Sequence, residues 1–389
     1  MTRLLLASVL VAATSFAQRV PWVSETPSIP SNLPGDPAVL LTPKLTVVGT
    51  DTIQPQVFFW PVGQAAISYP AGPANSADAR ETLVAVGVPA SNTVLLFAVT
   101  DAGLTPLDTG TFTVPSPRQV ALRQSGAGFE LFIATSNQTI EHHRLAIADG
   151  GVTFTARPSI TVSEPSSGLA ADDRTGQLYV AQPTRGVVLV QTDNSASFLM
   201  SIDAGHLGTA VGGLGLYPAL DGGTLVFTTA PNESRLQVHS GQGAYLGTLS
   251  VGDVDGGPAS LGRPDFLDVF AQPAPGFPRG VVVVEDAITA NYKIISLADI
   301  DAVFPLPPSF APPGPDAGPG ADAGTDAGTV VRTDAGTGTG AGGGVGGNPG
   351  PPPSAEPNTP SCGCTGGPFV ILPGLLLLWW IRRLRQTHS

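Results

Sequence analysis

Short apolar runs rich in β-branched and aromatic residues alternate with turns through most of the chain. They recur between Thr82 and Ile300, at positions 83–86, 94–99, 129–133, 177–180, 186–190, 225–228 and 280–284. Turn pairs such as Asp149-Gly150 and Asp221-Gly222 separate them. No amphipathic pattern of helical period and useful length accompanies these runs. Many short strands at this spacing predict an all-β fold, which is a sandwich, a barrel or a propeller.

The first 17 residues have the pattern of a secretory signal peptide. Arg3 gives a positive start, residues 4–13 form an apolar core too short to span a bilayer, and Ser15-Phe16-Ala17 places small residues at the cleavage position. We expect a signal peptidase to cut after Ala17. The alternative is a buried N-terminal helix.

Residues 306–360 form a low-complexity tract of Gly, Pro, Ala and Asp. The triplet D-A-G begins at Asp316, Asp322, Asp326 and Asp334. Because the tract has little apolar surface to bury, we expect a disordered, extended linker. A calcium loop of the EF-hand type is the other interpretation, but the closing Glu of such a loop is missing.

The C-terminal segment 361–389 combines a short Cys motif, an apolar stretch and a basic tail. Cys362 and Cys364 precede the apolar residues 368–381, and Arg382 and Arg383 follow. This order resembles the MYXO-CTERM sorting signal of myxobacterial surface proteins, in which a sortase-like membrane protease processes the chain near the Cys. The resemblance implies a secreted protein of the cell envelope or outer surface, held in the membrane by this segment before processing. A soft metal at the C-x-C pair lacks further His or Cys ligands nearby.

Composition narrows the choice of partners and of domain organisation. The chain has 389 residues and a formal net charge of −12, which argues against nucleic acid as a partner. Its two cysteines lie in the C-terminal segment, so the folded part has no disulfide. We expect a Pro-rich extension with the first strands at 18–60 and the main domain at 61–305. That length suits a propeller of five or six blades of about 40–50 residues each.

Nucleophile and zinc motifs such as G-x-S-x-G and H-E-x-x-H are missing from the sequence. We expect packed or solvated roles for the five histidines, which are His142, His143, His206, His239 and His388. Carboxylates cluster near strand ends, at Asp172-Asp173, between Asp253 and Asp268, and at Glu285-Asp286. Either they converge around a hard cation such as Ca²⁺, or they serve ordinary turn geometry.

Five segments in order resemble the β-propeller phytases. The family's T-E-G-M-A-A-D-D-x-x-G-x-L-Y-I-A-E-E is similar to residues 166–183, and its E-G-L-T-I-Y to residues 212–217. Its D-T-D-G-I-D-V is similar to residues 263–269, G-P-x-x-P-x-G-L-x-V-x-Q-D to 274–286, and N-F-K to 291–293. A fainter match places V-D-I-R on Val120-Ala-Leu-Arg123. The resemblance extends over about residues 163–300.

This resemblance implies a six-bladed propeller with Ca²⁺ at the central channel and a phosphorylated substrate such as phytate. The retained positions are Asp172, Asp173, Asp265, Asp268, Asp286, Asn291, Lys293 and Arg123. The implied calcium ligands are Asp172, Asp173, Asp265, Asp268 and Asp286. The implied phosphate-binding residues are Arg123 and Lys293, and the implied catalytic residues are Asp172, Asp286, Lys293 and Arg123. Arg263 stands where the family has Asp, and we expect its guanidinium to bind phosphate as well, in a site that differs from the family's. Bridging Ca²⁺ would activate a water and neutralise phosphate oxygens.

Several family acids are replaced. Ser167, Gly212 and Gln182 stand where the family has Glu, and Arg263 and Ala121 stand where it has Asp. The acids of the family's D-D-P-A find no counterpart, because Asp36-Pro37-Ala38 lies far upstream of the next matched strand. Each lost acid lowers the charge available to bind calcium. Two functions therefore stay open: a calcium-dependent phosphatase of the 3-phytase type, and a catalytically degenerate propeller that serves extracellular binding or adhesion.

Overall fold

The computed structural model describes residues 18–309 except 127, 204–205, 232 and 253–260. These residues belong to one of two units into which the chain divides, residues 1–320. The expected signal peptide, most of the linker and the C-terminal sorting segment, with Ala17, Cys362 and Cys364, lie outside the described residues. In the described residues, no helix has the length and apolar character needed to span a membrane.

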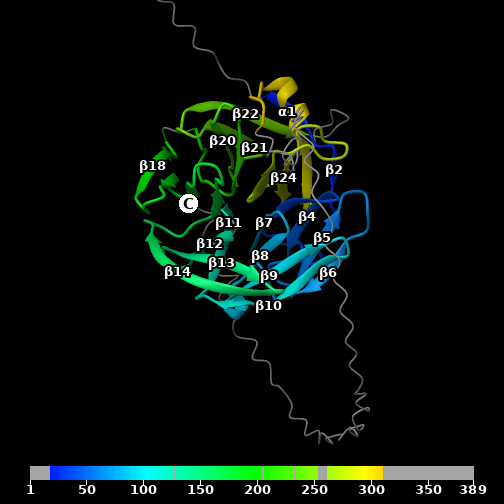
Figure 1. The fold of residues 1–389 in the computed structure, drawn as a ribbon. Helices are drawn as coiled ribbons and strands as arrows, with labels where there is room; N and C mark the ends of the chain where they lie inside the picture. Colours follow the sequence, from blue (N-terminus) through cyan, green and yellow to red (C-terminus); the bar gives the residue numbers. More distant parts are fainter. Residues whose placement is uncertain (1–17, 127, 204–205, 232, 253–260, 310–389) are drawn as a thin grey trace, which may run out of the picture. The chain divides into compact units, whose positions relative to one another are not determined.

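The described strands form six antiparallel blades arranged in chain order (Figure 1). Blades 1 and 2 are β3 (Ala38–Thr42), β4 (Lys44–Thr50), β5 (Gln56–Pro61) and β6 (Ile67–Pro70), then β7 (Ser76–Arg80), β8 (Leu83–Val88), β9 (Thr93–Thr100) and β10 (Gly103–Thr113). Blades 3 and 4 are β11 (Pro117–Ser125), β12 (Gly128–Thr135), β13 (Thr139–Ala148) and β14 (Gly151–Thr161), then β15 (Gly168–Ala171), β16 (Leu178–Gln182), β17 (Gly186–Val190) and β18 (Ala196–Ser201). Blades 5 and 6 are β19 (Leu214–Pro218), β20 (Thr224–Thr229), β21 (Arg235–Ser240) and β22 (Tyr245–Gly252), then β23 (Leu267–Phe270), β24 (Val281–Asp286) and β25 (Asn291–Ser296). Blades 2 and 3 share one sheet through a single parallel pair, Asp108 and Gly151.

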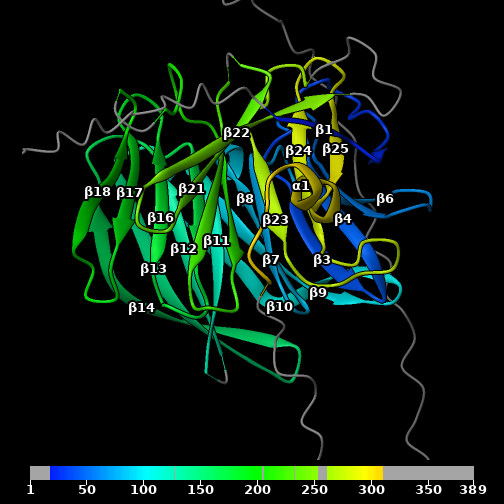
Figure 2. The same ribbon diagram turned by 90° about the horizontal axis from the view of Figure 1, so that it is seen from above.

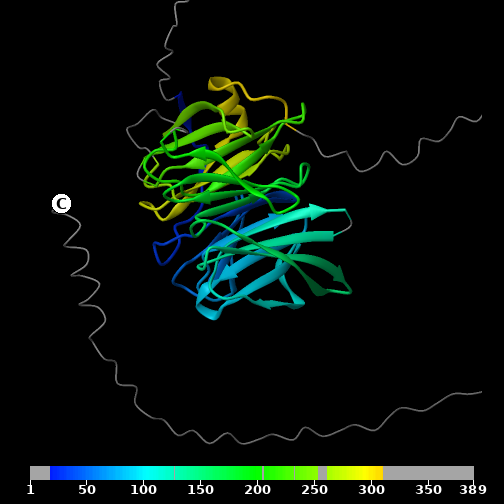
Figure 3. The same ribbon diagram turned by 90° about the vertical axis from the view of Figure 1, so that its left-hand side faces the viewer.

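Two N-terminal strands connect the beginning of the chain to its last blades. β2 (Ser24–Glu25) is the fourth strand of blade 6, with Ser24 opposite Ile294 and Glu25 opposite Lys293. β1 (Gln18–Pro21) adds a parallel edge strand to β22 of blade 5. Figure 3 shows this dark blue segment beside the yellow strands of blade 6. The ring is therefore closed by hydrogen bonds between its two ends.

Each interface between neighbouring blades contains an apolar core, which explains the uninterrupted apolar runs in the sequence. Val282 and Val284 pack toward blade 5, whereas Val281 and Val283 pack toward blade 1. Both faces of the blade are thus covered, and all four valines are fully buried. A strand buried on both faces reads as a continuous apolar run instead of an alternating one. The single α-helix in the described residues, α1 (Leu297–Val303), begins at Ser296, whose side chain accepts a hydrogen bond from the Ala298 amide.

The all-β propeller prediction is confirmed, and the number of described blades is six. The expected boundary at residue 61 falls inside blade 1, because β5 ends there and β6 follows. Prolines hid this blade from the sequence pattern, since they flank its strands instead of interrupting their cores.

The innermost strands of the blades, β3, β7, β11, β15, β19 and β23, run in the same direction and contact one another in ring order. Figure 2 shows β3 and β7 side by side among them. At their beginnings the Asp36 amide donates to Asn75 (2.9 Å) and the Gly213 amide donates to Asp265. We call the end of the channel where these strands begin the start rim, and the opposite end the end rim. In each blade, the first hairpin turn lies at the end rim and the second lies at the start rim.

Candidate functional site

The channel between the inner strands contains a cavity of about 410 Å³. Its walls come from the inner strands of all blades, and its deepest polar groups are three carboxylates, Asp36, Asp78 and Asp268. Asp36 and Asp78 are buried, with exposed fractions of 7% and 9%, and Asp268 is partly buried. A single cation, Arg80, lines the same cavity and forms an ion pair with Asp78 (3.1 Å).

The three channel carboxylates differ in how their oxygens are satisfied. Asp78 accepts from the Leu122 amide (2.6 Å) and Asp268 accepts from the Val39 amide (2.8 Å), so each links neighbouring blades. The Asp36 carboxylate makes no hydrogen bond in the described part of the chain. Burial raises the pKa of Asp36 well above its ordinary value, and the charges of Asp268 and Asp78 raise it further. Burial also raises the pKa of Asp78 to about 7, against the opposing charge of Arg80.

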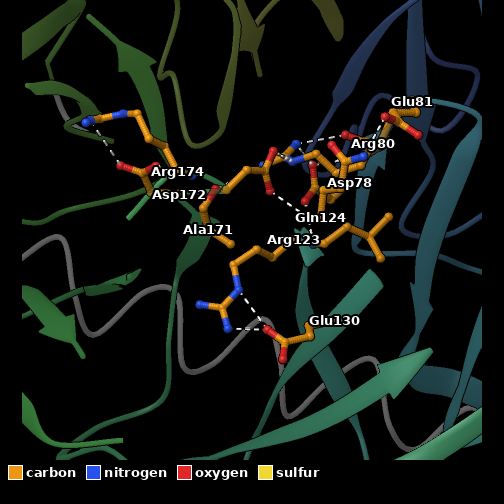
Figure 4. Close-up of polar contacts among 12 residues, drawn as sticks. Asp78, Arg80, Glu81, Arg123, Gln124, Glu130, Ala171, Asp172 and Arg174 are labelled. Carbon is orange, nitrogen blue, oxygen red and sulfur yellow. Dashed lines mark hydrogen bonds and ion pairs between the residues drawn. The ribbon is translucent and has the colours of Figure 1, made fainter. Parts of the chain in front are cut away.

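The predicted ligands Asp172 and Asp173 lie at the end rim, in the turn after β15. Asp172 accepts from the amides of Arg174 (2.9 Å) and Thr175 (3.1 Å) and from the Thr224 hydroxyl of blade 5 (2.7 Å). Asp173 accepts from the Gln124 amide of blade 3 (2.7 Å). These bonds shape the turn and tie three blades together, and Figure 4 shows Asp172 beside Arg174 in this turn. The positions of Asp172 and Asp173 therefore agree with the second interpretation of the sequence, in which these acids serve ordinary turn geometry.

The predicted catalytic residue Arg123 also lies toward the end rim, on β11. Its guanidinium is paired with Glu130 on β12, donates to the carbonyl of Gly176 and lies 5.1 Å from the centre of the Phe132 ring. The imidazole of His142, 3.7 Å from Glu130, and the Arg123 guanidinium lower the pKa of Glu130 to about 2. Figure 4 shows Arg123 turned toward Glu130. An arginine engaged in this way stabilises the junction between blades 3 and 4.

A second group of acids lies at the start rim, where blade 6 meets blade 5. Asp265 precedes β23, and Glu285 and Asp286 end β24. The Glu285 carboxylate accepts from the Asp265 amide (3.1 Å), and it is 2% exposed. Burial raises the pKa of Glu285 well above its ordinary value, and the charge of Asp265 adds to this. Burial raises the pKa of Asp265 as well, while the charge of Arg263 opposes the shift.

Asp286 and Lys293 occupy the second hairpin of blade 6 at the same rim. One oxygen of Asp286 accepts from the amides of Ile288 (3.0 Å) and Thr289 (3.2 Å), and the other lies 3.9 Å from the ammonium of Lys293. Lys293 is 3% exposed, is paired with Glu25 of the N-terminal strand and lies 4.8 Å from the centre of the Trp22 ring. Asn291, the other retained residue of this hairpin, accepts from the Thr289 hydroxyl (2.8 Å).

The replaced family positions lie at the start rim too. The Ser167 hydroxyl donates to the Val211 carbonyl (2.8 Å), and the Gln182 amide lies 3.0 Å from the Ser163 hydroxyl. A Cβ atom at Gly212 would overlap the carbonyl oxygen of Asp265. The backbone of Asp265 leaves no room for a side chain at position 212, so a Glu there would require the backbone to shift. Glu285 is an additional acid relative to the family, because the family pattern has Gln at that position.

The five predicted calcium ligands do not meet at one centre. Asp172 and Asp173 lie at the end rim, Asp265 and Asp286 lie at the start rim, and Asp268 lies between them with both oxygens bonded to backbone amides. Across the described ranges, no group of three or more His, Cys, Asp or Glu side chains is placed to hold a metal ion. The predicted phosphate-binding residues are divided in the same way, with Arg123 apart from Lys293 and Arg263.

Sequence reasoning missed Asp36, Asp78 and Arg80. Asp36-Pro37-Ala38 begins the first inner strand, so its distance from the next matched segment was no reason to set it aside. Ala77-Asp78-Ala79-Arg80 on β7 repeats the acid-x-Arg spacing of V-D-I-R and keeps its acid, which Val120–Arg123 lacks. The signal was present, but it required knowing that both segments are inner strands.

Comparisons with known proteins give one family match and several similar solved structures. A protein-family model described as Phytase matches residues 124–304, somewhat less than half of the chain. No curated protein matches. Among solved structures, similar chains occur in the mitotic checkpoint complex (14% identity, 76% of this chain and 99% of that chain, TM-score 0.49) and in BBS1N in complex with ARL6DN soaked with mercury (10%, 65% and 74%, TM-score 0.44). A catalytically inactive virginiamycin B lyase from Staphylococcus aureus with quinupristin is also similar (10%, 70% and 98%, TM-score 0.42). These TM-scores are below 0.5, and we draw nothing further from them. Residues 124–304, from β11 to the end of α1, are thus similar to the phytase family, which makes this propeller phytase-like.

Proposed function

We propose that the chain hydrolyses phosphate monoesters of phytate or a similar organic phosphate at the start rim, with the help of Ca²⁺. One observation carries the proposal. Of the residues retained from the phytase pattern, Asp265, Asp286 and Lys293 lie together at this rim, and the additional acid Glu285 lies beside them. The retained residues of the end rim hold turns and blade junctions instead.

The start rim offers a specific division of roles. Glu285 is buried and Asp265 is half-buried, and both have raised pKa values, so a divalent cation that offsets their charge would find two ligands there. Two protein carboxylates are few for calcium, and we propose that substrate phosphate oxygens complete its coordination. Calcium would neutralise the phosphate and help water to attack. Arg263, exposed beside Asp265, and Lys293 would bind the adjacent phosphate.

The experiment is phosphate release from phytate by the purified chain, with calcium and with a chelator, across about pH 4–9. We expect calcium-dependent release that falls about 100-fold in Glu285→Gln and in Asp265→Asn. The matched control is Asp193→Asn, because Asp193 is an exposed turn residue of blade 4 whose side chain bonds only locally. Unchanged release in Glu285→Gln would contradict the proposal.

Calorimetric titration sharpens the same test. If substrate oxygens complete the coordination, calcium binds weakly to the free chain and at least tenfold more tightly when a non-hydrolysed phosphate ligand is present. Equal calcium affinities with and without the phosphate ligand would show that the protein alone supplies the calcium ligands. That result would contradict the proposed site of two carboxylates completed by substrate.

The second candidate is a degenerate propeller that binds a phosphorylated ligand without turnover. It is favoured by the engagement of Lys293 with Glu25 and Trp22, which leaves the lysine little exposed surface for a substrate. Binding of a phosphorylated small molecule without phosphate release under any of the conditions above would support this candidate.

We also propose that the chain is secreted and sorted to the cell envelope by a signal peptidase and a sortase-like membrane protease. β1 begins at Gln18, directly after the expected cleavage site, so cleavage would leave the described fold intact. Mass spectrometry of the mature protein should find Gln18 at its N-terminus. A Cys362→Ala, Cys364→Ala double variant should accumulate unprocessed in the membrane fraction, and normal processing of that variant would contradict the sorting proposal.

A further inference from the structure

A second pocket lies outside the channel, on blade 5. It has a volume of about 240 Å³ and lies between the segment that leads into the blade and its outer strands β21 and β22. The side chains that line it are those of His206, Glu233, Arg235, Gln237, Tyr245 and Thr248. These positions lie inside the matched range 124–304 but outside the short motif segments that resemble the phytases, and the proposed hydrolysis does not use them.

The back of this pocket contains a buried side-chain amide whose oxygen has no hydrogen-bond partner. Gln237 is 2% exposed, and its side-chain oxygen accepts no hydrogen bond. Thr228, directly opposite it on β20, is fully buried, and its hydroxyl oxygen is also unpaired. Buried polar groups without partners are rare, and each lowers the stability of the fold. An unpaired buried acceptor that lines a pocket, as the Gln237 oxygen does, indicates a place for a ligand that donates a hydrogen bond.

The rim of the pocket adds charges of both signs and an aromatic pair. Arg235 and Glu233 line it, and neither forms an ion pair within the described part of the chain. The ring of His206 stacks on that of Tyr245 at 4.3 Å, and the Tyr245 hydroxyl contacts Thr248 (2.7 Å). His206 has a φ of 55°, in the left-handed region that non-glycine residues seldom occupy. Such strain is often found where a side chain is positioned for binding.

We propose that this pocket binds one sugar ring, as a neutral monosaccharide or a terminal unit of a glycan. Neighbouring hydroxyl groups both donate and accept, so they can pair with the Gln237 oxygen, with Glu233 and with Arg235 at once. A phosphate brings no donor for Gln237 and is repelled by Glu233, and an alkylammonium ion is repelled by Arg235. The volume lies below the roughly 300–1,000 Å³ of pockets for larger ligands, which fits a single ring.

The test is saturation-transfer NMR and calorimetry on the full chain with single hexoses and N-acetylhexosamines at about 10 mM. We expect one of these sugars to bind, and Gln237→Leu to weaken its binding about tenfold or more. The control is Gln242→Leu, an exposed glutamine of the β21–β22 hairpin, which should bind as the unaltered chain does. Because Gln237→Leu removes an unpaired buried group, it should fold at least as stably, and a sugar-induced rise in Tm should disappear in this variant alone.

Phosphate release separates this inference from the proposed hydrolysis, because Gln237→Leu should leave that activity unchanged. If no sugar of the panel gives saturation transfer, or if Gln237→Leu and Gln242→Leu bind one equally well, the pocket holds only water and the proposal is wrong. Arg235→Ala provides a second check, since a sugar should lose about fivefold or more in affinity without the guanidinium.

Discussion

The two rims of the channel are rich in the same residue types but use them in opposite ways. At the end rim, Asp172 and Asp173 accept hydrogen bonds from backbone amides, and Glu130 is paired with Arg123. At the start rim and just inside the channel, Glu285 and Asp36 are buried among other acids, and burial with like charge raises their pKa values. Acids of the first kind stabilise the fold. Acids of the second kind lower its stability at neutral pH, as expected where a binding site is kept at a cost in stability.

This contrast identifies what distinguishes a structural carboxylate from a functional one in this fold. The number of acids near a strand end carries little information, because both rims have several. What differs is whether burial and neighbouring acids raise the pKa of the carboxylate, as they do for Asp36 and Glu285. By that criterion the candidate site consists of the start rim and the channel behind it.

Loss of the ion pair at the end rim should have the largest effect on stability. Glu130→Ala leaves the Arg123 guanidinium, whose side chain is 12% exposed, without its carboxylate. We expect a loss of about 3 kcal/mol in the free energy of unfolding, measured by urea titration at neutral pH. Glu233→Ala, at an acid without an ion pair in the described chain, is the control and should lose well under half as much. A loss below about 1 kcal/mol for Glu130→Ala would mean that the end rim is not the structural one.

The second largest effect should be a rise in stability on mild acidification. Asp78 has its pKa raised to about 7 by burial, so the folded state binds its proton before the unfolded chain, whose carboxyl titrates near pH 4. The stabilisation from protonation is absent above the folded pKa and grows as the pH falls through it. From about pH 8 to pH 5 we expect a gain of about 2 kcal/mol from this group.

Asp36, Asp268 and Glu285 act in the same direction, because their pKa values are raised as well. Glu130, with its pKa lowered to about 2, loses stability only at much lower pH. Asp78→Asn should therefore reduce the gain, whereas Asp193→Asn should not alter it. A stability that falls steadily from pH 8 to pH 5 would show that the channel acids are not the unfavourable ones.

Arg263→Asp tests whether the start rim holds calcium. This change restores an acid of the phytase pattern and removes a positive charge beside Asp265. We expect calcium affinity to rise about tenfold, measured by calorimetry, because ligand charge is a main determinant of that affinity. Arg174→Asp at the end rim is the matched change. Equal effects of the two substitutions would point to bulk charge instead of a site.

The smallest effect should come from Asp172→Asn. The amide oxygen still accepts from the turn amides, so we expect a cost of only about 1 kcal/mol and no change in phosphate release. This outcome opposes the sequence-based expectation that Asp172 is catalytic. A loss of release of 100-fold or more with an unchanged free energy of unfolding would restore that role and remove the contrast between the rims.

The propeller itself could be predicted because its signals are local. Runs such as 280–284 are apolar throughout since blades cover both their faces, and turn residues separate them at regular spacing. Blade 1 was harder to predict from the sequence. Its strands are bordered by prolines, and its inner strand is preceded by a segment that belongs to blade 6.

The site could be predicted only in part. Asp265, Glu285, Asp286 and Lys293 could be found from their order in the chain. Placing Asp172 and Asp286 correctly requires knowing at which end of the channel the hairpin of each residue lies. The spacing of residues in the sequence does not give this information. The first hairpin of a blade and the second lie at opposite rims, so acids that are equally close to strands in the sequence end far apart. The pocket of blade 5 had no motif, since it depends on the register that places Gln237 beside Thr228 and Thr248.

The strand β2, only two residues long, has a consequence for how the molecule is made. It is synthesised before any blade, yet its partner β25 is nearly the last strand to appear. The ring therefore stays open until almost all of the described sequence has been produced, and the edge of blade 6 has no partner until then. An exposed edge of this kind is a site for aggregation. Chains interrupted before residue 291 should consequently depend on a chaperone or be degraded, however well their first five blades are formed.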